Sequence, residues 1–382
     1  MASAVKCRGD LLDDVDADGN TLMCDAASAG QAEAVEQLLR RGADPLLAGP
    51  GGPPLLLATG KKHVDVVDRL LDWHRDEGAD VGINAADHEG RTPLFESVYC
   101  GIDVMRRLLA AGADPNICNT NGWSPLMLAS GYRNTSGEEA VELLLAHGAD
   151  VNRKTDEQIA ALHLACMRNN CGTVTALLRR GADTEALSEH GNTALIYACT
   201  NVDAIDVVRL LLDAGAQVEG RGGSGWTPLH VASENGNIEV ISELLARGAC
   251  SDAVTVSNAT PLCLAVIKRA APAVRALLEA PSVPSALSPL TREDWCFLFN
   301  CEREARREAR SKAEAALRDE RAAHVATQDA FRFAIPHMLA ACSSSSLSTT
   351  PGRRAPKRRR LLEEAGDPYA VETTTTSDEV PS

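Results

Sequence analysis

The stretch Gly225-Trp-Thr-Pro-Leu-His-Val-Ala232 decides the fold of this chain. Thr227 is a residue type that caps helices, and Pro228 at the first helical position needs no hydrogen-bond donor. Leu229 and Ala232 then place one large and one small apolar group on the same helix face. The stretch therefore predicts the start of a short helix that a neighbouring helix can approach closely.

The second half of the same unit predicts another helix. Apolar residues at 240–245 have helical spacing, and Gly248 predicts an end in a left-handed conformation. Gly-Ala recurs at positions 42, 78, 112, 148, 181, 215 and 248, so the spacing is 33 to 36 residues. Thr-Pro-Leu, Ser-Pro-Leu or a degenerate form lies about twenty residues before most of these. A fixed period of this length indicates a repeat solenoid.

The repeated unit resembles the ankyrin-repeat family. The resemblance rests on Asp87-His-Glu-Gly-Arg-Thr-Pro-Leu94, Gly148-Ala-Asp-Val-Asn152 and the stretch at 225–232. It covers eight units, at 16–47, 48–86, 87–118, 119–154, 155–187, 188–221, 222–254 and 255–281. It implies an all-α solenoid of about eight helix-turn-helix units with projecting turn fingers. We expect an N-terminal lead-in at 1–15, the array at 16–281, a charged helical extension at 282–340 and a disordered tail at 341–382.

Composition agrees with thin helical layers and gives no sign of a cofactor. The chain has 382 residues, 45% of them hydrophobic but only 3% aromatic, so Leu, Ala and Val must fill the core. Its 12 cysteines contain no Cys-x-x-Cys pair, which favours reduced thiols over a metal site or disulfides. We find no phosphate-binding loop and no hydrolase, kinase or zinc-enzyme motif. The sequence therefore predicts a noncatalytic protein without cofactor or metal.

The net charge of −15 belongs to the array. Residues 1–281 hold 23 basic and 38 acidic side chains, whereas 282–382 hold 15 of each. An acidic array disfavours nucleic-acid binding and favours basic partner surfaces. A solvated convex face is the alternative explanation of the acidic charge.

Family members mostly bind other proteins through the fingers and the exposed face of the inner helices. Positions there that the repeat does not specify are the candidates for a partner-binding surface. They are Arg91, Tyr99, Trp123, Tyr132, Met167, Arg168, Asn192, Thr200, Asn201, Trp226, Glu234 and Asn235. Tryptophan, tyrosine and arginine are enriched at binding hot spots, so we expect Trp123 and Trp226 to anchor a partner protein. The alternative is that each Trp packs on the neighbouring finger.

Two further residue types occupy motif positions. His163 and His230 stand where the family's imidazole hydrogen-bonds within or between turns. Asn116 and Asn152 lie in Gly-Ala-Asp-x-Asn turns, where family members can be hydroxylated by an asparaginyl hydroxylase. Turn formation is the alternative role of both asparagines.

The C-terminal hundred residues suggest a helix and a targeting signal. The pattern at 291–333 predicts a charged helix, either solvated and extending the cap of the array or forming a coiled-coil dimer. Its apolar ends are expected to pack on the last repeat or to dock another protein. The basic cluster, Arg353, Arg354, Lys357, Arg358, Arg359 and Arg360, resembles a nuclear localisation signal read by an import receptor. Nucleic-acid contact is its competing use.

These features predict a scaffold or adaptor that binds a partner protein and regulates signalling or transcription in the nucleus. We expect the nucleus, the cytoplasm or both as its location, and no membrane association, because no apolar stretch reaches about 18 residues. Two alternatives remain open. One is a substrate-recognition adaptor of a ubiquitin ligase, and the other is a nucleic-acid-associated protein that uses the cluster at 353–360.

Overall fold

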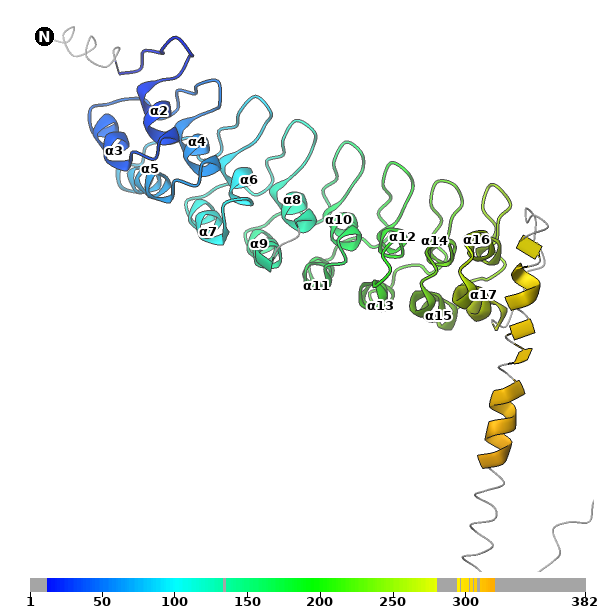
Figure 1. Ribbon diagram of the computed structural model, residues 1–382. Helices are drawn as coiled ribbons and strands as arrows, with labels where there is room; N and C mark the ends of the chain where they lie inside the picture. The colour runs from blue at the N-terminus through cyan, green and yellow to red at the C-terminus, as the bar shows by residue number, and fades with distance from the viewer. Residues whose placement is uncertain are drawn as a thin grey trace, which may run out of the picture. The chain divides into compact units, whose positions relative to one another are not determined.

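The computed structural model describes residues 12–132, 135–279, 294, 295, 297–301, 303, 304, 306, 307 and 310–319. Within 22–278 the chain forms eight helix pairs (Figure 1). The pairs are α2 (Leu22–Ser28) and α3 (Ala32–Arg40), α4 (Pro54–Gly60) and α5 (Val64–Glu77), α6 (Pro93–Ser97) and α7 (Ile102–Ala110), α8 (Pro125–Gly131) and α9 (Thr135–Ala146), α10 (Ala161–Met167) and α11 (Cys171–Arg179), α12 (Ala194–Ala198) and α13 (Ile205–Asp213), α14 (Pro228–Asn235) and α15 (Ile238–Ala246), and α16 (Pro261–Ile267) and α17 (Ala271–Leu278). The predicted all-α solenoid of about eight units is confirmed.

Successive units stack in order. Each first helix packs on the first helix of the next pair, from α2 through to α16, and each second helix packs likewise from α3 to α17 (Figure 1). Finger turns project beyond the row of first helices, which we call the inner helices. Each unit therefore depends mainly on its nearest neighbours for its stability.

Hydroxyl caps start most of the inner helices. The Thr92 Oγ1 accepts a hydrogen bond from the Phe95 N–H at 3.2 Å, and the Thr260 Oγ1 accepts one from Cys263 at 3.3 Å. Proline follows the cap at the first helical position in both. The threonine and proline of the repeated triplet thus act as the sequence predicts.

The second helices of the pairs, which we call the outer helices, mostly end at a glycine in a left-handed conformation. Gly148 has a φ of 86° and Gly215 one of 93°. A Cβ built on either would meet no atom within 4 Å. The backbone conformation, rather than crowding, therefore requires glycine at these positions.

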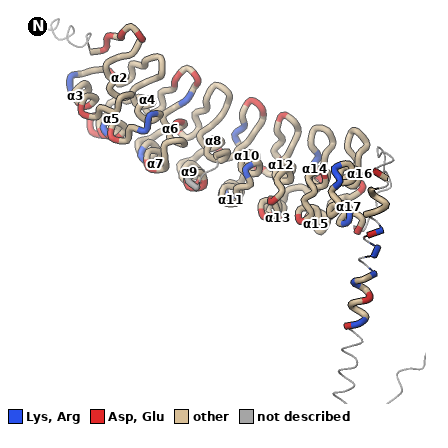
Figure 2. Tube along the Cα trace, viewed as in Figure 1, with Lys and Arg blue, Asp and Glu red and all other residues tan. Residues whose placement is uncertain are grey.

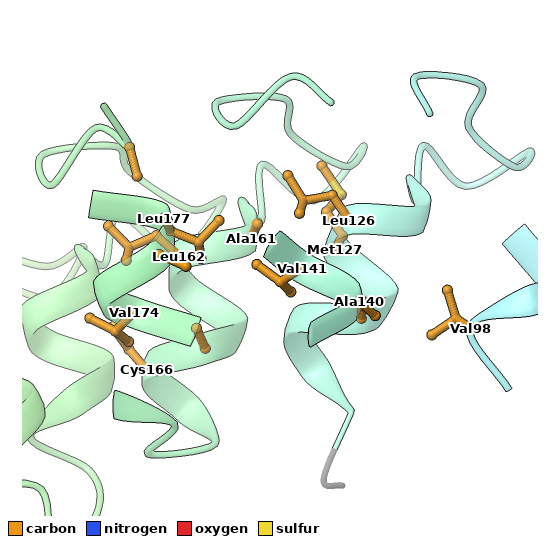
Figure 3. Close-up of a cluster of buried hydrophobic side chains, with 14 of the residues drawn as sticks. Val98, Leu126, Met127, Ala140, Val141, Ala161, Leu162, Cys166, Val174 and Leu177 are labelled. Atoms are coloured by element: carbon orange, nitrogen blue, oxygen red, sulfur yellow. The ribbon is translucent and has the colours of Figure 1, made fainter. Parts of the chain in front are cut away.

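The core consists of small aliphatic layers. Leu126, Met127, Val141 and Leu162 are buried between neighbouring helix pairs (Figure 3). Among the described residues, Phe95 is the only phenylalanine, tyrosine or tryptophan that is buried. This explains how a chain with 3% aromatic residues fills its interior.

Two irregular units differ from their predicted form. The sequence predicts an insertion in unit 2 around 73–78, and the structure places it in α5, which has 14 residues where α7 has nine. The sequence also predicts a lengthened turn between the helices of unit 4, at 133–137, and this prediction is wrong because α9 begins at Thr135. Both irregularities are therefore built mainly into helices rather than loops.

Part of the C-terminal extension covers the end of the array. The chain divides into two compact units, Met1–Glu308 and Ala309–Ser382. Within the first unit, Leu298 and Cys301 are buried in the core cluster, and Arg275 pairs with Glu304 at 2.6 Å. This supports the predicted extension of the cap. Residues 310–319 of the second unit are helical and exposed, while the predictions for 282–293, for 320–340 and for the tail lie outside the described residues.

Candidate functional site

The predicted binding positions fall into two rows. Finger residues directly before the inner-helix caps form one row: Arg91, Trp123, Asn192 and Trp226. Residues at or just after the C-terminal ends of the inner helices form the other: Tyr99, Tyr132, Met167, Arg168, Thr200, Asn201, Glu234 and Asn235. The two rows meet at units 6 and 7.

A groove of about 790 Å³ lies between units 6 and 7. Fingers 189–192 and 223–226 and the helices α12 and α14 line it. It brings together five of the predicted positions, which are Asn192, Thr200, Trp226, Glu234 and Asn235. We call it the 6/7 groove.

The tryptophans predicted as anchors are half-buried. Trp123 and Trp226 both pack against the core cluster, and the Trp226 ring lies 6.2 Å from the His230 ring. The two tryptophans belong to units 4 and 7, and only Trp226 lines the 6/7 groove. Tyr99 and Tyr132 instead meet edge to face, with ring centroids 5.5 Å apart. The aromatic residues predicted to form one binding surface therefore lie in separate places along the array.

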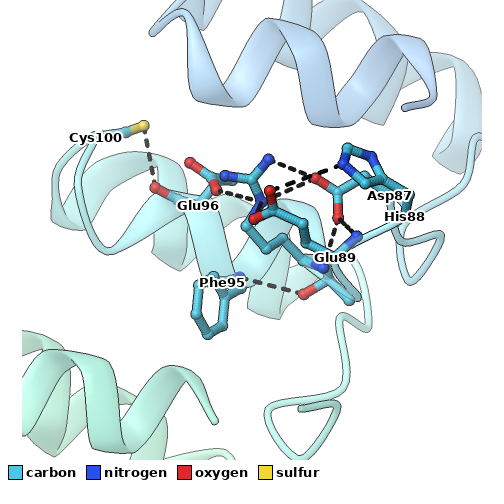
Figure 4. Close-up of polar contacts among 8 residues, drawn as sticks. Asp87, His88, Glu89, Phe95, Glu96 and Cys100 are labelled. Carbon is cyan, nitrogen blue, oxygen red and sulfur yellow. Dashed lines mark hydrogen bonds and ion pairs between the residues drawn. The ribbon is translucent and has the colours of Figure 1, made fainter. Parts of the chain in front are cut away.

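Arg91 is held within its own unit by acidic side chains. Figure 4 labels its partners Asp87, Glu89 and Glu96. Its guanidinium contacts the buried Asp87 carboxylate at 2.7 Å and lies 3.4 Å from Glu89 and 3.5 Å from Glu96. Burial acts to raise the Asp87 pKa, but hydrogen bonds from the Arg91 backbone and side chain outweigh it and lower the pKa. Burial raises the Glu96 pKa, against the attraction of Arg91. This cluster fixes the base of the finger of unit 3.

Three predicted binding residues also join neighbouring units. Arg168 Nε donates to the Gly131 carbonyl at 2.9 Å, Asn201 Nδ2 to Cys166 at 3.0 Å and Asn235 Nδ2 to Cys199 at 3.3 Å. Each bond reaches a carbonyl at or just after the C-terminal end of the preceding inner helix, where the carbonyls are not fully satisfied within the helix. This role was not predicted from the sequence, although the same position in three units carries a side chain with N–H donors.

The asparagines expected as hydroxylation sites bridge successive turns. Asn116 Oδ1 accepts from the Asp150 N–H at 2.8 Å, and its Nδ2 donates to the Gly148 carbonyl at 3.0 Å. Asn152 repeats this arrangement toward Asp183 and Gly181, at 2.8 and 3.2 Å. These bonds give both residues a structural role, and their hydroxylation stays a prediction.

His163 and His230 are buried and hydrogen-bonded at both ring nitrogens. His163 Nδ1 accepts from the Ala160 N–H at 3.0 Å, and Nε2 donates to the Ala186 carbonyl at 2.8 Å. His230 Nδ1 accepts from the Thr227 N–H at 3.1 Å, and Nε2 donates to the Ala259 carbonyl at 3.1 Å. Burial lowers both pKa values. The predicted bonding of the imidazoles within and between turns is confirmed.

The distribution of acidic residues, the length of apolar helices and the grouping of metal-binding side chains are relevant to the kind of partner. Acidic residues occur on several fingers and outer helices (Figure 2). Within the described part of the chain, no helix is both long and apolar enough to cross a membrane. No group of three or more metal-binding side chains occurs there either.

Comparisons with known proteins agree with the repeat architecture. The profile of the family described as "Ankyrin repeats (3 copies)" matches residues 22–117, 55–155, 97–188, 135–222 and 220–285. The B-cell lymphoma 3 protein homolog of Mus musculus is 31% identical over 222 residues, which cover 57% of this chain and 49% of that protein. Ankyrin repeat and SOCS box protein 16 of Homo sapiens is 31% identical over 217 residues, or 55% and 46% of the two chains. The nuclear factor NF-kappa-B p105 subunit of Gallus gallus is 29% identical over 192 residues, or 49% and 19%. This chain therefore spans about half the length of the first two relatives or less.

Proposed function

Because the chain belongs to the ankyrin-repeat family, whose repeats bind partner proteins, we propose that it is a noncatalytic scaffold that binds its partner between the fingers and the inner helices. The 6/7 groove is the observation that carries this proposal. It gathers five predicted positions into one concavity, and the Trp226 indole forms part of its wall. Concave sites lined by apolar and aromatic groups with a few polar groups are typical of binding sites.

An alanine scan of the full-length chain tests the proposal. Partners are captured from a cell lysate with the wild type and with Trp123→Ala, Trp226→Ala and the double variant, and the retained proteins are quantified by mass spectrometry. Glu142→Ala, on the exposed side of α9, is the matched surface control. We expect a partner set that Glu142→Ala retains and Trp226→Ala loses by about tenfold or more. Circular dichroism checks that each variant is folded. Equal retention by the two tryptophan variants and the control would contradict the proposal.

A nuclear role in signalling or transcription is the finer form of this proposal. The basic cluster, which includes Lys357 and lies outside the described residues, supports it. One relative is named a nuclear factor. Residues 351–362 fused to a fluorescent reporter should concentrate it in the nucleus, and Lys357→Ala with Arg358→Ala should return it to the cytosol. A reporter that stays cytosolic without these substitutions would refute the targeting proposal.

A ubiquitin-ligase adaptor is the second candidate. The relative named for a SOCS box, and another named E3 ubiquitin-protein ligase KEG from Arabidopsis thaliana, favour it. The KEG similarity covers 71% of this chain but only 17% of that protein. Affinity purification of full-length chain and of residues 1–281 separates the candidates. Cullin components that only the full-length chain retains would support the adaptor, and their absence from both would refute it.

A further inference from the structure

We propose that the 6/7 groove selects an arginine or lysine side chain from an extended segment of the partner protein. This inference rests on the proposed function and names the chemistry of the partner. The apolar surface of the groove, its hydrogen-bond acceptors and its charge each favour such a side chain.

The groove offers a surface for the apolar stem of a long cationic side chain. Ile196 and Val231 line it from α12 and α14 and are almost completely buried, with 3% and 8% of their surface exposed. The half-buried Trp226 indole lies beside them in the lining. Arginine and lysine bury their methylene stems on apolar surface while their charged ends stay near water. An indole face also attracts a cation through its ring quadrupole.

The polar groups of the groove mainly present acceptor oxygens. Thr200 Oγ1 already donates its proton to the Tyr197 carbonyl at 2.7 Å, so its lone pairs remain for a donor. Asn235 uses one N–H of its Nδ2 on the Cys199 carbonyl, and its amide oxygen can accept from a ligand. Guanidinium and ammonium groups carry donors only, so they suit such a lining.

The negative charge of the groove favours a cationic side chain over a neutral hydrogen-bond donor. Glu189 and Glu234 supply two carboxylates, and no lysine or arginine is among the described residues that line the groove. Lys268 of unit 8 contacts Glu234 at 3.1 Å, and both side chains remain partly exposed. Glu189 is exposed on the finger and has no such cation bonded to it within the described residues. The whole of 1–281, with 23 basic and 38 acidic side chains, adds attraction at longer range.

A peptide selection with a double-mutant cycle tests the inference. A phage-displayed random dodecapeptide library is selected on the full-length chain, and peptides that lose binding on Trp226→Ala are synthesised. In each peptide, the basic residues are replaced one at a time, arginine by citrulline or lysine by acetyl-lysine. Affinities are then measured on the wild type, on Glu189→Gln/Glu234→Gln and on the control Glu142→Gln.

We expect the peptides to share one basic residue whose neutralisation weakens binding to the wild type and to Glu142→Gln by about tenfold. On Glu189→Gln/Glu234→Gln the same neutralisation should change affinity less than about twofold. Groove-dependent peptides that lack a basic residue, or an equal effect of neutralisation on all three proteins, would overturn the inference. A selection that yields no peptide sensitive to Trp226→Ala would overturn it as well. The proposed function fails separately, when the captured partner is retained by both tryptophan variants.

Discussion

Lowering the pH from 7.5 to 5.5 should destabilise units 5 and 7 through their buried histidines. His163 and His230 have no exposed surface, and each accepts a backbone N–H at Nδ1 while donating from Nε2. Protonation would add a proton to Nδ1, which now accepts a backbone N–H, and two donors would then face each other. The folded state therefore favours the neutral ring, in agreement with the lowered pKa values.

The sign and size of the effect follow from proton linkage. Because the folded pKa lies below the ordinary value of 6.5, the unfolded chain binds more protons once the pH falls under 6.5. The stabilisation is complete above this pH and is lost as the pH decreases toward the folded pKa. Each ring contributes a slope of at most about 1.4 kcal/mol per pH unit, so the two together contribute at most about 2.7 kcal/mol per pH unit.

Urea unfolding between pH 7.5 and 5.5, followed by far-UV circular dichroism, measures this slope. The comparison protein is His163→Gln/His230→Gln, which cannot titrate at these positions but keeps a donor near each carbonyl. Because long repeat arrays can unfold in stages, hydrogen exchange should locate the loss of protection in α10–α11 and α14–α15. If the free energy of unfolding has the same pH slope in the wild type and in the double variant, the two imidazoles are not buried in the neutral form.

Three further substitutions follow from particular contacts. Gly215→Ala should lower the free energy of unfolding in urea by about 1–2 kcal/mol, because only the left-handed backbone opposes a Cβ there. Gly191→Ala should lower it by more, since its Cβ would also lie 2.9 Å from the Gly223 nitrogen. Equal losses in the two variants would contradict this prediction. Asn152→Ala should lose about 1–2 kcal/mol of stability and speed amide exchange at Asp183. In the wild type, mass spectrometry of the peptide that contains Asn152, after incubation with an asparaginyl hydroxylase, checks for the predicted gain of one oxygen atom. Leu298→Ala should cost about 2–3 kcal/mol and increase exchange in α16 and α17, and unchanged exchange there would show that 294–301 does not stabilise the array.

The fold could be predicted from the sequence because its signals are local. The cap of Thr227, the proline after it and the left-handed Gly248 act within one unit, and their repetition makes the pattern visible. The stack follows because a single helix pair cannot bury its apolar face alone. Even the low aromatic content agrees with the buried layers of leucine, alanine and valine.

The contacts between units could not be predicted in the same way. Arg168 and Asn201 meet carbonyls 37 and 35 residues away, and those carbonyls become neighbours only after stacking. A sequence motif describes one unit, so it marks these positions as variable without showing the bond. The 6/7 groove is a similar case, because its two walls come from different units. A side chain with N–H donors recurring at one repeat position was the available signal for the bonds.

This double use of variable positions decides which substitutions can separate binding from stability. Asn235 lines the groove and also donates to Cys199, so its replacement would weaken both the site and the contact between units 6 and 7. Glu189 projects from an exposed part of the finger, where its backbone N–H donates to the Glu157 carbonyl of the preceding finger. Its side chain can be changed with little effect on the stack. Loss of binding in Glu189 variants therefore reports on the partner, whereas loss in Asn235 variants cannot be assigned without a stability measurement.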